Sequence, residues 1–173
     1  MCVQDKYPGV TPVHIEARDP TDADARYCLS EYFAELDRRF DSGFDPAASL
    51  PADDDEMRPP LGVFLIATFE GEPVGCGALK FHNDAPTELK RMWVAPRTRG
   101  LGIGRRLLAE LERRAARVGS RSIRLETNRT LTEAITMYRS AGYEAVRSFN
   151  DERYADHWFE KSLERPPPEL HRS

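Results

Sequence analysis

The chain has little cysteine and no long apolar run. Its three cysteines, Cys2, Cys28 and Cys76, lie far apart in 173 residues, so they match neither a metal-binding motif nor a disulfide framework. No stretch of about 18 apolar residues is present, which excludes a membrane-spanning helix. Residues 1–11 are polar and lack the apolar core of a secretory signal. We therefore expect a cytoplasmic protein that binds no metal and no membrane.

The rest of the composition is that of one globular domain. Hydrophobic residues make up 40% of the chain and aromatic residues 9%, enough to build a substantial core. The net charge is −4, but residues 97–124 hold nine arginines and two glutamates. This segment carries +7 and the remaining residues sum to −11. A basic segment in an acidic protein favours one anionic ligand at one place over general binding of nucleic acid. The segment also lacks aromatic residues on which bases could stack.

Residues 99–106, Arg-Gly-Leu-Gly-Ile-Gly-Arg-Arg, are the most informative stretch. Glycine lets backbone N–H groups approach an anion closely, and a helix N-terminus presents unpaired N–H groups. The stretch therefore predicts a phosphate-binding turn, because a plain turn before a helix needs one glycine rather than three. No Lys-Ser/Thr pair follows as in a P-loop, and the glycine spacing is not the G-x-G-x-x-G of dinucleotide binding.

Periodicity places this turn inside an alternating α/β chain. Strands are predicted at residues 13–17, 61–69, 74–82, 88–94, 122–127, 143–149 and 156–163. Helices are predicted up to about Phe40, over 103–118 and from a capping box of Thr130 and Glu133 to Gly142. The strand–helix–strand order over 88–127 indicates a right-handed parallel unit. We expect an N-terminal extension over residues 1–12, one domain over 13–163 and a disordered proline-rich tail over 164–173.

Three segments together resemble a known family. Arg99-x-x-Gly102-x-Gly104 matches the acetyl-CoA signature of the GNAT superfamily of N-acetyltransferases. Residues 90–96 resemble that family's fourth strand and residues 132–143 its second conserved segment, so the resemblance covers about residues 61–163. It implies a single α/β domain with a mixed central sheet, splayed between its fourth and fifth strands and flanked by helices on both faces. It also implies transfer of an acetyl group from acetyl-CoA to a primary amine by direct attack in a ternary complex.

The resemblance assigns roles to residues of this chain. Tyr138 would be the general acid that protonates the leaving thiolate, since a phenol stays protonated at neutral pH. Periodicity alone favours a core residue at Tyr138, because it lies on the apolar face of its helix. Glu88 is the first candidate for the base, and Glu126 and His157 are alternatives. The expected cofactor-binding residues are Met92, Trp93, Val94, Arg99, Gly100, Leu101, Gly102, Ile103, Gly104 and Arg105, with Arg97 as another phosphate contact.

One position departs from the family's pattern. Family members often have an asparagine seven positions before the tyrosine, where it contacts the cofactor, and here that position is Leu131. Asn128 is the candidate replacement. A non-catalytic regulator that binds acetyl-CoA, and a nucleic-acid binder that uses the arginine-rich helix, stay open as alternatives.

The acceptor cannot be read from a motif. Tyr32, Phe33, Phe40 and the loops 41–60 and 150–156 are expected to shape its site. An amino acid, a polyamine, a drug and a protein N-terminus all stay open, and so does a homodimer. The acidic run at residues 53–56 is either a solvated loop or a lip that attracts a cationic substrate, so acidic surroundings favour a small cationic amine.

Overall fold

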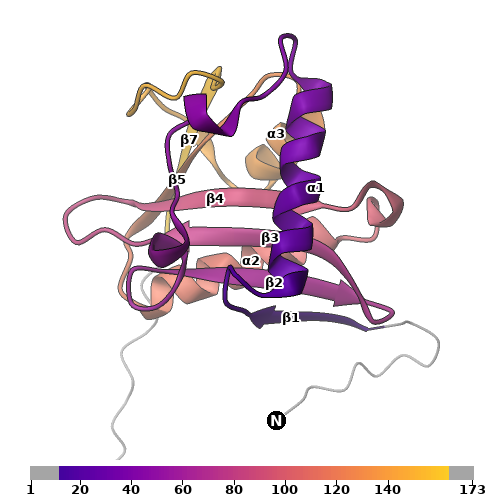
Figure 1. Cartoon of the computed structure of the whole chain (residues 1–173). Helices are drawn as coiled ribbons and strands as arrows, with labels where there is room; N and C mark the ends of the chain where they lie inside the picture. Colours follow the sequence, from indigo (N-terminus) through magenta and orange to yellow (C-terminus); the bar gives the residue numbers. More distant parts are fainter. Residues whose placement is uncertain (1–11, 164–173) are drawn as a thin grey trace, which may run out of the picture.

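Seven strands form one mixed sheet in the computed structural model, which describes residues 12–163. Figure 1 shows the sheet with β1 at its lower edge. The strand order is β1-β2-β3-β4-β5-β7-β6; β4 and β5 run parallel and the other neighbours antiparallel. The bounds are β1 Val13–Ala17, β2 Gly62–Phe69, β3 Glu72–Lys80, β4 Thr87–Val94, β5 Ser122–Thr127, β6 Glu144–Ala145 and β7 His157–Ser162.

Helices cover both faces of the sheet. α1 (Ala23–Arg39) crosses the near face in Figure 1, and α2 (Ile103–Arg117) runs behind it. α3 (Thr132–Ser140) follows β5 and packs against the start of α2, where a Cβ added to Gly104 would lie 3.0 Å from Met137 Sδ. Three short 3₁₀ helices, η1 (Pro46–Ala48), η2 (Asp54–Met57) and η3 (Pro96–Thr98), lie in the connections. Within residues 12–163, no helix has the length and apolarity to cross a membrane.

The central strands are buried on both sides because α1 and α2 pack on opposite faces. This burial explains the continuous apolar run of β2, in which residues 63–67 are at most 5% exposed. α2 buries Leu107, Leu111 and Ala115 along one face. The helix lies so close that a Cβ on Gly77 of β3 would come within 2.7 Å of Leu111 Cδ1. This packing fixes the glycine turn at the start of α2 relative to the sheet.

β4 and β5 begin as partners and then separate. Their register holds two pairs, Thr87 with Ile123 and Glu88 with Arg124, although both strands continue. On the other edge of β4 the register shifts between Cys76 and Ala78, so that β4 has one residue more than β3 there. This bulge includes Arg91, whose φ is +57°. The splay expected between the fourth and fifth strands is therefore confirmed.

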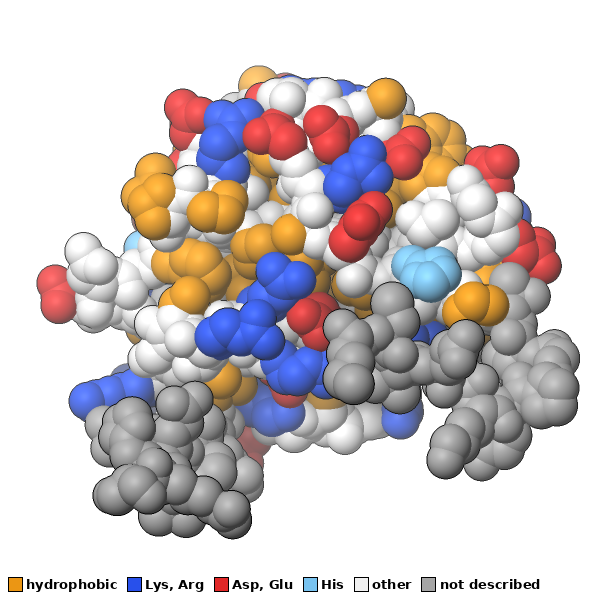
Figure 2. All heavy atoms as spheres, turned by 90° about the horizontal axis from the view of Figure 1, so that it is seen from below, with side chains coloured by type: hydrophobic (Ala, Val, Ile, Leu, Met, Phe, Trp, Pro, Cys, Tyr) orange, Lys and Arg blue, Asp and Glu red, His pale blue; other side chains and the backbone are white. Residues whose placement is uncertain are grey.

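The basic segment is partly neutralised by its own helix. Arg113 and Arg114 both pair with Glu110, one turn away on α2. At the β1 edge, Arg18 likewise pairs with Asp22 at 2.9 Å. Figure 2 looks onto this edge and shows basic side chains among acidic and apolar ones. Two arginines of the basic segment are therefore paired with an acidic side chain of their own helix.

Two local predictions were wrong. The strand predicted over 143–149 is two residues long, because the chain leaves β7 after Val146 N donates to Trp158 O at 2.9 Å. The expected capping box does not form either, since α3 starts at Thr132 with Leu131 as its N-cap. The hydroxyl of Thr130 instead donates to Asn128 Oδ1 at 2.8 Å. The expected tail, 164–173, and residues 1–11 of the expected extension lie outside the described residues.

Leu111→Ala tests the packing that positions α2. The substitution removes a fully buried side chain between α2 and β3, so we expect the free energy of unfolding to fall by about 2–5 kcal/mol. Urea denaturation followed by circular dichroism measures the loss. Val118→Ala, at a position 58% exposed at the end of α2, is the control and should stay within about 0.5 kcal/mol of the parent. Equal effects of the two substitutions would contradict this account of the core.

Candidate active site

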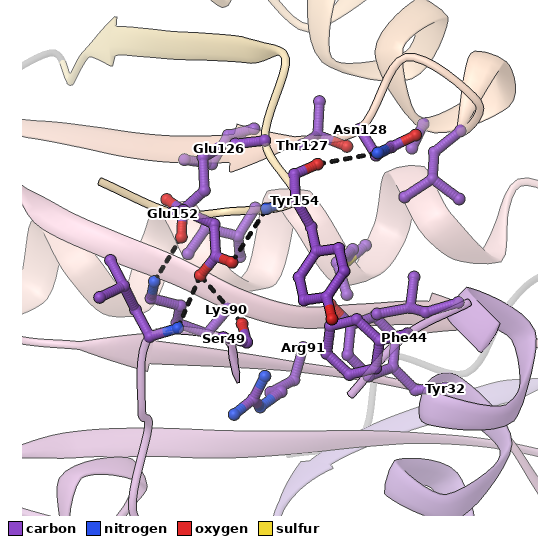
Figure 3. A pocket seen from close by; sticks show the side chains of 18 of the residues that line it. Tyr32, Phe44, Ser49, Lys90, Arg91, Glu126, Thr127, Asn128, Glu152 and Tyr154 are labelled. Atoms are coloured by element: carbon purple, nitrogen blue, oxygen red, sulfur yellow. Dashed lines mark hydrogen bonds and ion pairs between the residues drawn. The ribbon is translucent and has the colours of Figure 1, made fainter. Parts of the chain in front are cut away.

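Two cavities lie along the line where β4 and β5 separate. The larger, here called the cleft, has a volume of about 460 Å³ and is lined by the glycine turn, β4, α1 and α3. The smaller, here called the pocket, has a volume of about 90 Å³ and is lined by aromatic and charged side chains (Figure 3). The two cavities adjoin, because five residues line both of them: Tyr32, Leu36, Met92, Leu131 and Ala134.

The glycine turn presents free backbone to the cleft. Gly100 and Gly102 have φ of +86° and +77°, and a Cβ on either would meet no atom within 4 Å. Gly102 is the N-cap of α2, and the first backbone bond of the helix runs from Arg106 N to Gly102 O at 3.1 Å. The helix therefore supplies no partner for the N–H groups of residues 103–105. These N–H groups and the positive end of the helix dipole form an anion site.

Charged side chains from three elements bridge the cleft. Arg99 of the turn pairs with Glu35 of α1, which is 8% exposed. Arg39 of α1 lies 3.7 Å from Glu35 and 2.9 Å from Glu133 of α3. Arg99 is therefore held by α1 at the edge of the anion site, where a phosphate would compete with Glu35 for it.

Most of the residues expected to bind the cofactor line this cleft. They are Met92, Trp93, Val94, Arg99, Gly100, Gly102, Ile103, Gly104 and Arg105. Leu101 does not line it and is 57% exposed, and Arg97 does not line it either. Gly104 contributes by close packing, since a Cβ there would lie 3.4 Å from Val94 Cγ2. The residues of the motif thus contribute to the cleft in different ways.

Asn128 lies in the pocket and not in the cleft. Its Nδ2 donates to Tyr154 O at 2.8 Å, and its Oδ1 accepts from Thr130 N at 2.9 Å. The carboxamide therefore ties the end of β5 to the loop before β7. Leu131, at the position where the family often has asparagine, lines both cavities.

Tyr138 offers an unbonded hydroxyl to the pocket. Its ring packs against Tyr143 and Phe159 at centroid distances of 5.8 and 6.5 Å, and the residue is 5% exposed. No hydrogen bond of its hydroxyl occurs within residues 12–163, whereas Tyr143 Oη donates to Glu112 at 3.2 Å. Burial, with the neighbouring Tyr32 and Glu126, raises the pKa of Tyr138 well above its ordinary value. The phenol is therefore a protonated donor beside the junction of the two cavities.

Glu88 lies where β4 and β5 are still paired, and it lines neither cavity. Its Oε2 lies 2.7 Å from His82 Nε2. Burial raises the pKa of Glu88, but the hydrogen bond with His82 and the charge of Lys90 outweigh burial and bring the pKa below its ordinary value. His157 also lines neither cavity and stacks on Phe159 at 6.1 Å. The structure does not bring either residue to Tyr138.

Glu126 lies on β5 two residues after Arg124, the partner of Glu88. Unlike Glu88, it lines the pocket together with Tyr138. Its Oε1 accepts from Lys90 Nζ at 2.6 Å across the gap between the strands. Its Oε2 is buried and has no hydrogen-bond partner among the described residues. An unpartnered buried carboxylate oxygen is costly, so this oxygen is an acceptor that a donor in the pocket can satisfy.

Residues that the sequence did not single out close the pocket. Glu152 accepts from Ser49 Oγ at 2.9 Å and from Leu50 N at 2.8 Å (Figure 3). Phe44 and Tyr154 pack at a centroid distance of 4.8 Å. Tyr32, Phe40 and the two expected loops do shape the pocket, whereas Phe33 lies outside its lining. No local pattern identifies these contacts of Glu152 and Phe44, because they join segments about 100 residues apart. Among the described residues, no group of three or more His, Cys, Asp or Glu could hold a metal ion.

Comparison with known proteins agrees with this geometry. An IAA acetyltransferase of Azospirillum brasilense is 36% identical over 110 residues, 63% of this chain and 72% of the relative. An uncharacterised N-acetyltransferase of Schizosaccharomyces pombe is 32% identical over 133 residues, 73% of this chain and 78% of the relative.

Solved structures share the fold. A Klebsiella pneumoniae protein assigned as an acyl-CoA N-acyltransferase has a TM-score of 0.69 and 28% identity, covering 87% of this chain and 97% of its own. An aminoglycoside 6'-N-acetyltransferase complexed with coenzyme A has a TM-score of 0.64 and 20% identity, covering 89% and 99%. Residues 29–143, most of the described chain, match the Acetyltransferase (GNAT) family. The chain belongs to that family.

Proposed function

We propose that this protein transfers the acetyl group of acetyl-CoA to a primary amine, by direct attack of the amine in a ternary complex. One observation carries the proposal: a cleft with an anion site adjoins a pocket that holds both an unbonded phenol and an unpartnered carboxylate oxygen. A phosphorylated acyl donor fits the cleft, and proton transfer at an amine and at a thiol fits the two groups in the pocket.

The cleft fits acetyl-CoA by its residues. The free N–H groups at the start of α2 would hold the pyrophosphate, with Arg99 beside them. The unpaired edge of β4 at residues 92–94 would accept and donate backbone hydrogen bonds with the amides of the pantetheine arm. The complex of the aminoglycoside 6'-N-acetyltransferase with coenzyme A supports this assignment, since that protein has the same fold.

The pocket residues divide the proton transfers between them. The amine nitrogen attacks the thioester carbon, a C–N bond forms and the C–S bond breaks. Glu126 accepts the proton that the amine loses, through its unpartnered Oε2. Tyr138 donates a proton to the departing sulfur. The burial that raises the pKa of Tyr138 also raises the proton affinity of a thiolate beside it, so that transfer from phenol to sulfur stays feasible.

Tyr138→Phe tests the general acid. The substitution removes one oxygen from a ring that stays packed, so we expect kcat to fall by about 100- to 10,000-fold while the Kd of acetyl-CoA is unchanged. Because the pKa of Tyr138 is raised, its hydroxyl stays protonated as pH rises. The parent kcat should therefore not decline up to about pH 10 through this group. Steady-state rates over a pH series and calorimetric titration with acetyl-CoA measure both.

The matched control is Tyr143→Phe, whose hydroxyl bonds Glu112 away from both cavities. It should lower stability by about 1 kcal/mol and leave kcat within a few-fold. Unchanged turnover in Tyr138→Phe would remove this residue from the mechanism. Acetyl-CoA binding by the parent without transfer to any amine in a broad panel would instead support a non-catalytic regulator.

Glu126→Gln and Glu88→Gln separate the two candidate bases. We expect Glu126→Gln to lower kcat/KM by about 100-fold or more, because the proton acceptor is lost. Glu88→Gln changes a residue outside both cavities and should keep kcat/KM within a few-fold of the parent. Initial rates with acetyl-CoA and an accepted amine between about pH 5 and 9 distinguish them. The reverse pattern would restore Glu88 as the base.

Arg99→Ala tests the anion site. Loss of one charge-assisted contact to phosphate should raise the KM of acetyl-CoA by about 10- to 100-fold and leave kcat nearly unchanged, because the contact is the same in ground and transition states. Arg97→Ala removes a neighbouring arginine that does not line the cleft and should change neither constant. A similar KM for both variants would show that general positive charge, and not the position of Arg99, matters.

A further inference from the structure

Arg91 is the pocket's cation that has no acidic partner. It lines the pocket with Lys90, Glu126 and Glu152. Lys90 pairs with Glu126 at 2.6 Å, but over residues 12–163 Arg91 forms no ion pair within 4 Å. Figure 3 shows the contrast, since dashed lines join Lys90 and Ser49 to carboxylates and none reaches Arg91. A guanidinium beside a cavity without a counter-ion is the complement of an anion on a ligand.

The backbone at Arg91 is held in an unusual conformation. Its φ of +57° is uncommon for a residue other than glycine, and it lies in the bulge of β4. Cys76 Sγ, buried on β3, donates to Arg91 O at 3.1 Å and thereby fixes the peptide. Bulges redirect side chains, and this one adds a residue to β4 beside the pocket. The residue with the strained backbone is thus the same residue that brings an unpaired positive charge to the pocket.

The side chain is also positioned without using its N–H groups on a carboxylate. The Arg91 guanidinium lies over the Phe33 ring at 5.0 Å from its centroid. A cation–π contact places the guanidinium without engaging a carboxylate, so the positive charge of Arg91 stays without an acidic partner. The phenol of Tyr32 lies beside it and also lines the pocket. Phe33 does not line the pocket itself, but its ring contacts the guanidinium of Arg91, which does.

The acidic groups of the pocket leave one place for an amine. Glu152 is occupied by Ser49 Oγ and Leu50 N. Glu126 Oε1 accepts a hydrogen bond from Lys90, whereas Glu126 Oε2 has no hydrogen-bond partner among the described residues. The pocket therefore has one unsatisfied anionic atom and one unpaired cation. A ligand with both an amine and a carboxylate matches both, whereas a polyamine would bring a second cation towards Arg91.

We infer that the acceptor is an α-amino acid, whose carboxylate is bound by the fork of Arg91 while its amine lies at Glu126. The inference rests on the proposed acetyl transfer and names its substrate class. The aromatic wall of Phe40, Phe44 and Tyr154 suits an apolar side chain on the acceptor. A protein N-terminus has an amide where this acceptor has its carboxylate, so it does not complement Arg91.

Matched pairs of acceptors test the carboxylate directly. Leucine with 3-methylbutylamine, and phenylalanine with phenethylamine, differ within each pair only in the carboxylate. With the full chain and acetyl-CoA, we expect kcat/KM to be about 10- to 100-fold higher for the amino acid of at least one pair. In Arg91→Asn, which tolerates positive φ, the ratio should fall to about 1 while the KM of acetyl-CoA is unchanged.

Arg38→Asn is the control. Arg38 is exposed on α1 outside both cavities, so this variant makes the same change of residue and should keep the parent's ratio. Equal or better use of the decarboxylated amines by the parent would overturn the amino-acid assignment and leave acetyl transfer to amines intact. An unchanged ratio in Arg91→Asn would overturn the role of Arg91. If neither member of any pair, nor any other amine, were acetylated, the proposed function itself would fail.

Discussion

Everything at this site depends on the separation of β4 from β5. Two parallel strands that pair at Thr87 and Glu88 and then diverge leave a row of backbone N–H and C=O groups without a strand partner. Such groups are costly to leave unpaired, so the opening favours a ligand that carries amides of its own. The divergence also determines which side chains face a cavity. Glu88 lies before it and is used by His82, whereas Glu126 lies after it and faces a cavity.

The second constraint is the closure of the pocket by segments distant in the chain. Asp45 N donates to Tyr154 Oη at 2.9 Å, and Glu152 holds Ser49 and Leu50. Hydrogen bonds to a charged group contribute about 1.5–3 kcal/mol each, while fixing the backbone of one residue costs roughly 1–2 kcal/mol. Glu152 can therefore hold only a few loop residues. The packing of Phe40 and Phe44 against Tyr154 has to order the rest, which makes the aromatic wall part of the loop's stability as well as of the pocket.

Local sequence patterns predicted those elements whose formation depends on neighbouring residues. Strands 13–17 and 122–127 and the start of α2 at Ile103 follow from alternation, helical periodicity and the glycine turn, and the structure has them at those residues. Signals that depend on distant partners failed. The hydroxyl of Thr130 could accept from a helix N–H, but it donates to Asn128 Oδ1 and the helix begins only at Thr132. Residues 143–149 alternate like a strand, yet Phe149 lies under the Arg124 guanidinium at 4.4 Å and the chain does not follow β7.

The bulge at Arg91 also depends on a distant partner strand, and it changes what the net charge predicts about the acceptor. Net charge indicates a diffuse field, which salt screens over about 8–10 Å. A guanidinium inside a cavity acts at contact distance, where an ion pair is worth about 4 kcal/mol at an effective dielectric constant of 20. One unpaired arginine can therefore outweigh an acidic surface in choosing a ligand. The amino-acid sequence of residues 88–94 does not predict a positive φ at Arg91, because the bulge arises from the pairing of β4 with β3. The sequence alone favours a small cationic amine, and the local geometry favours an amine that also carries a negative charge.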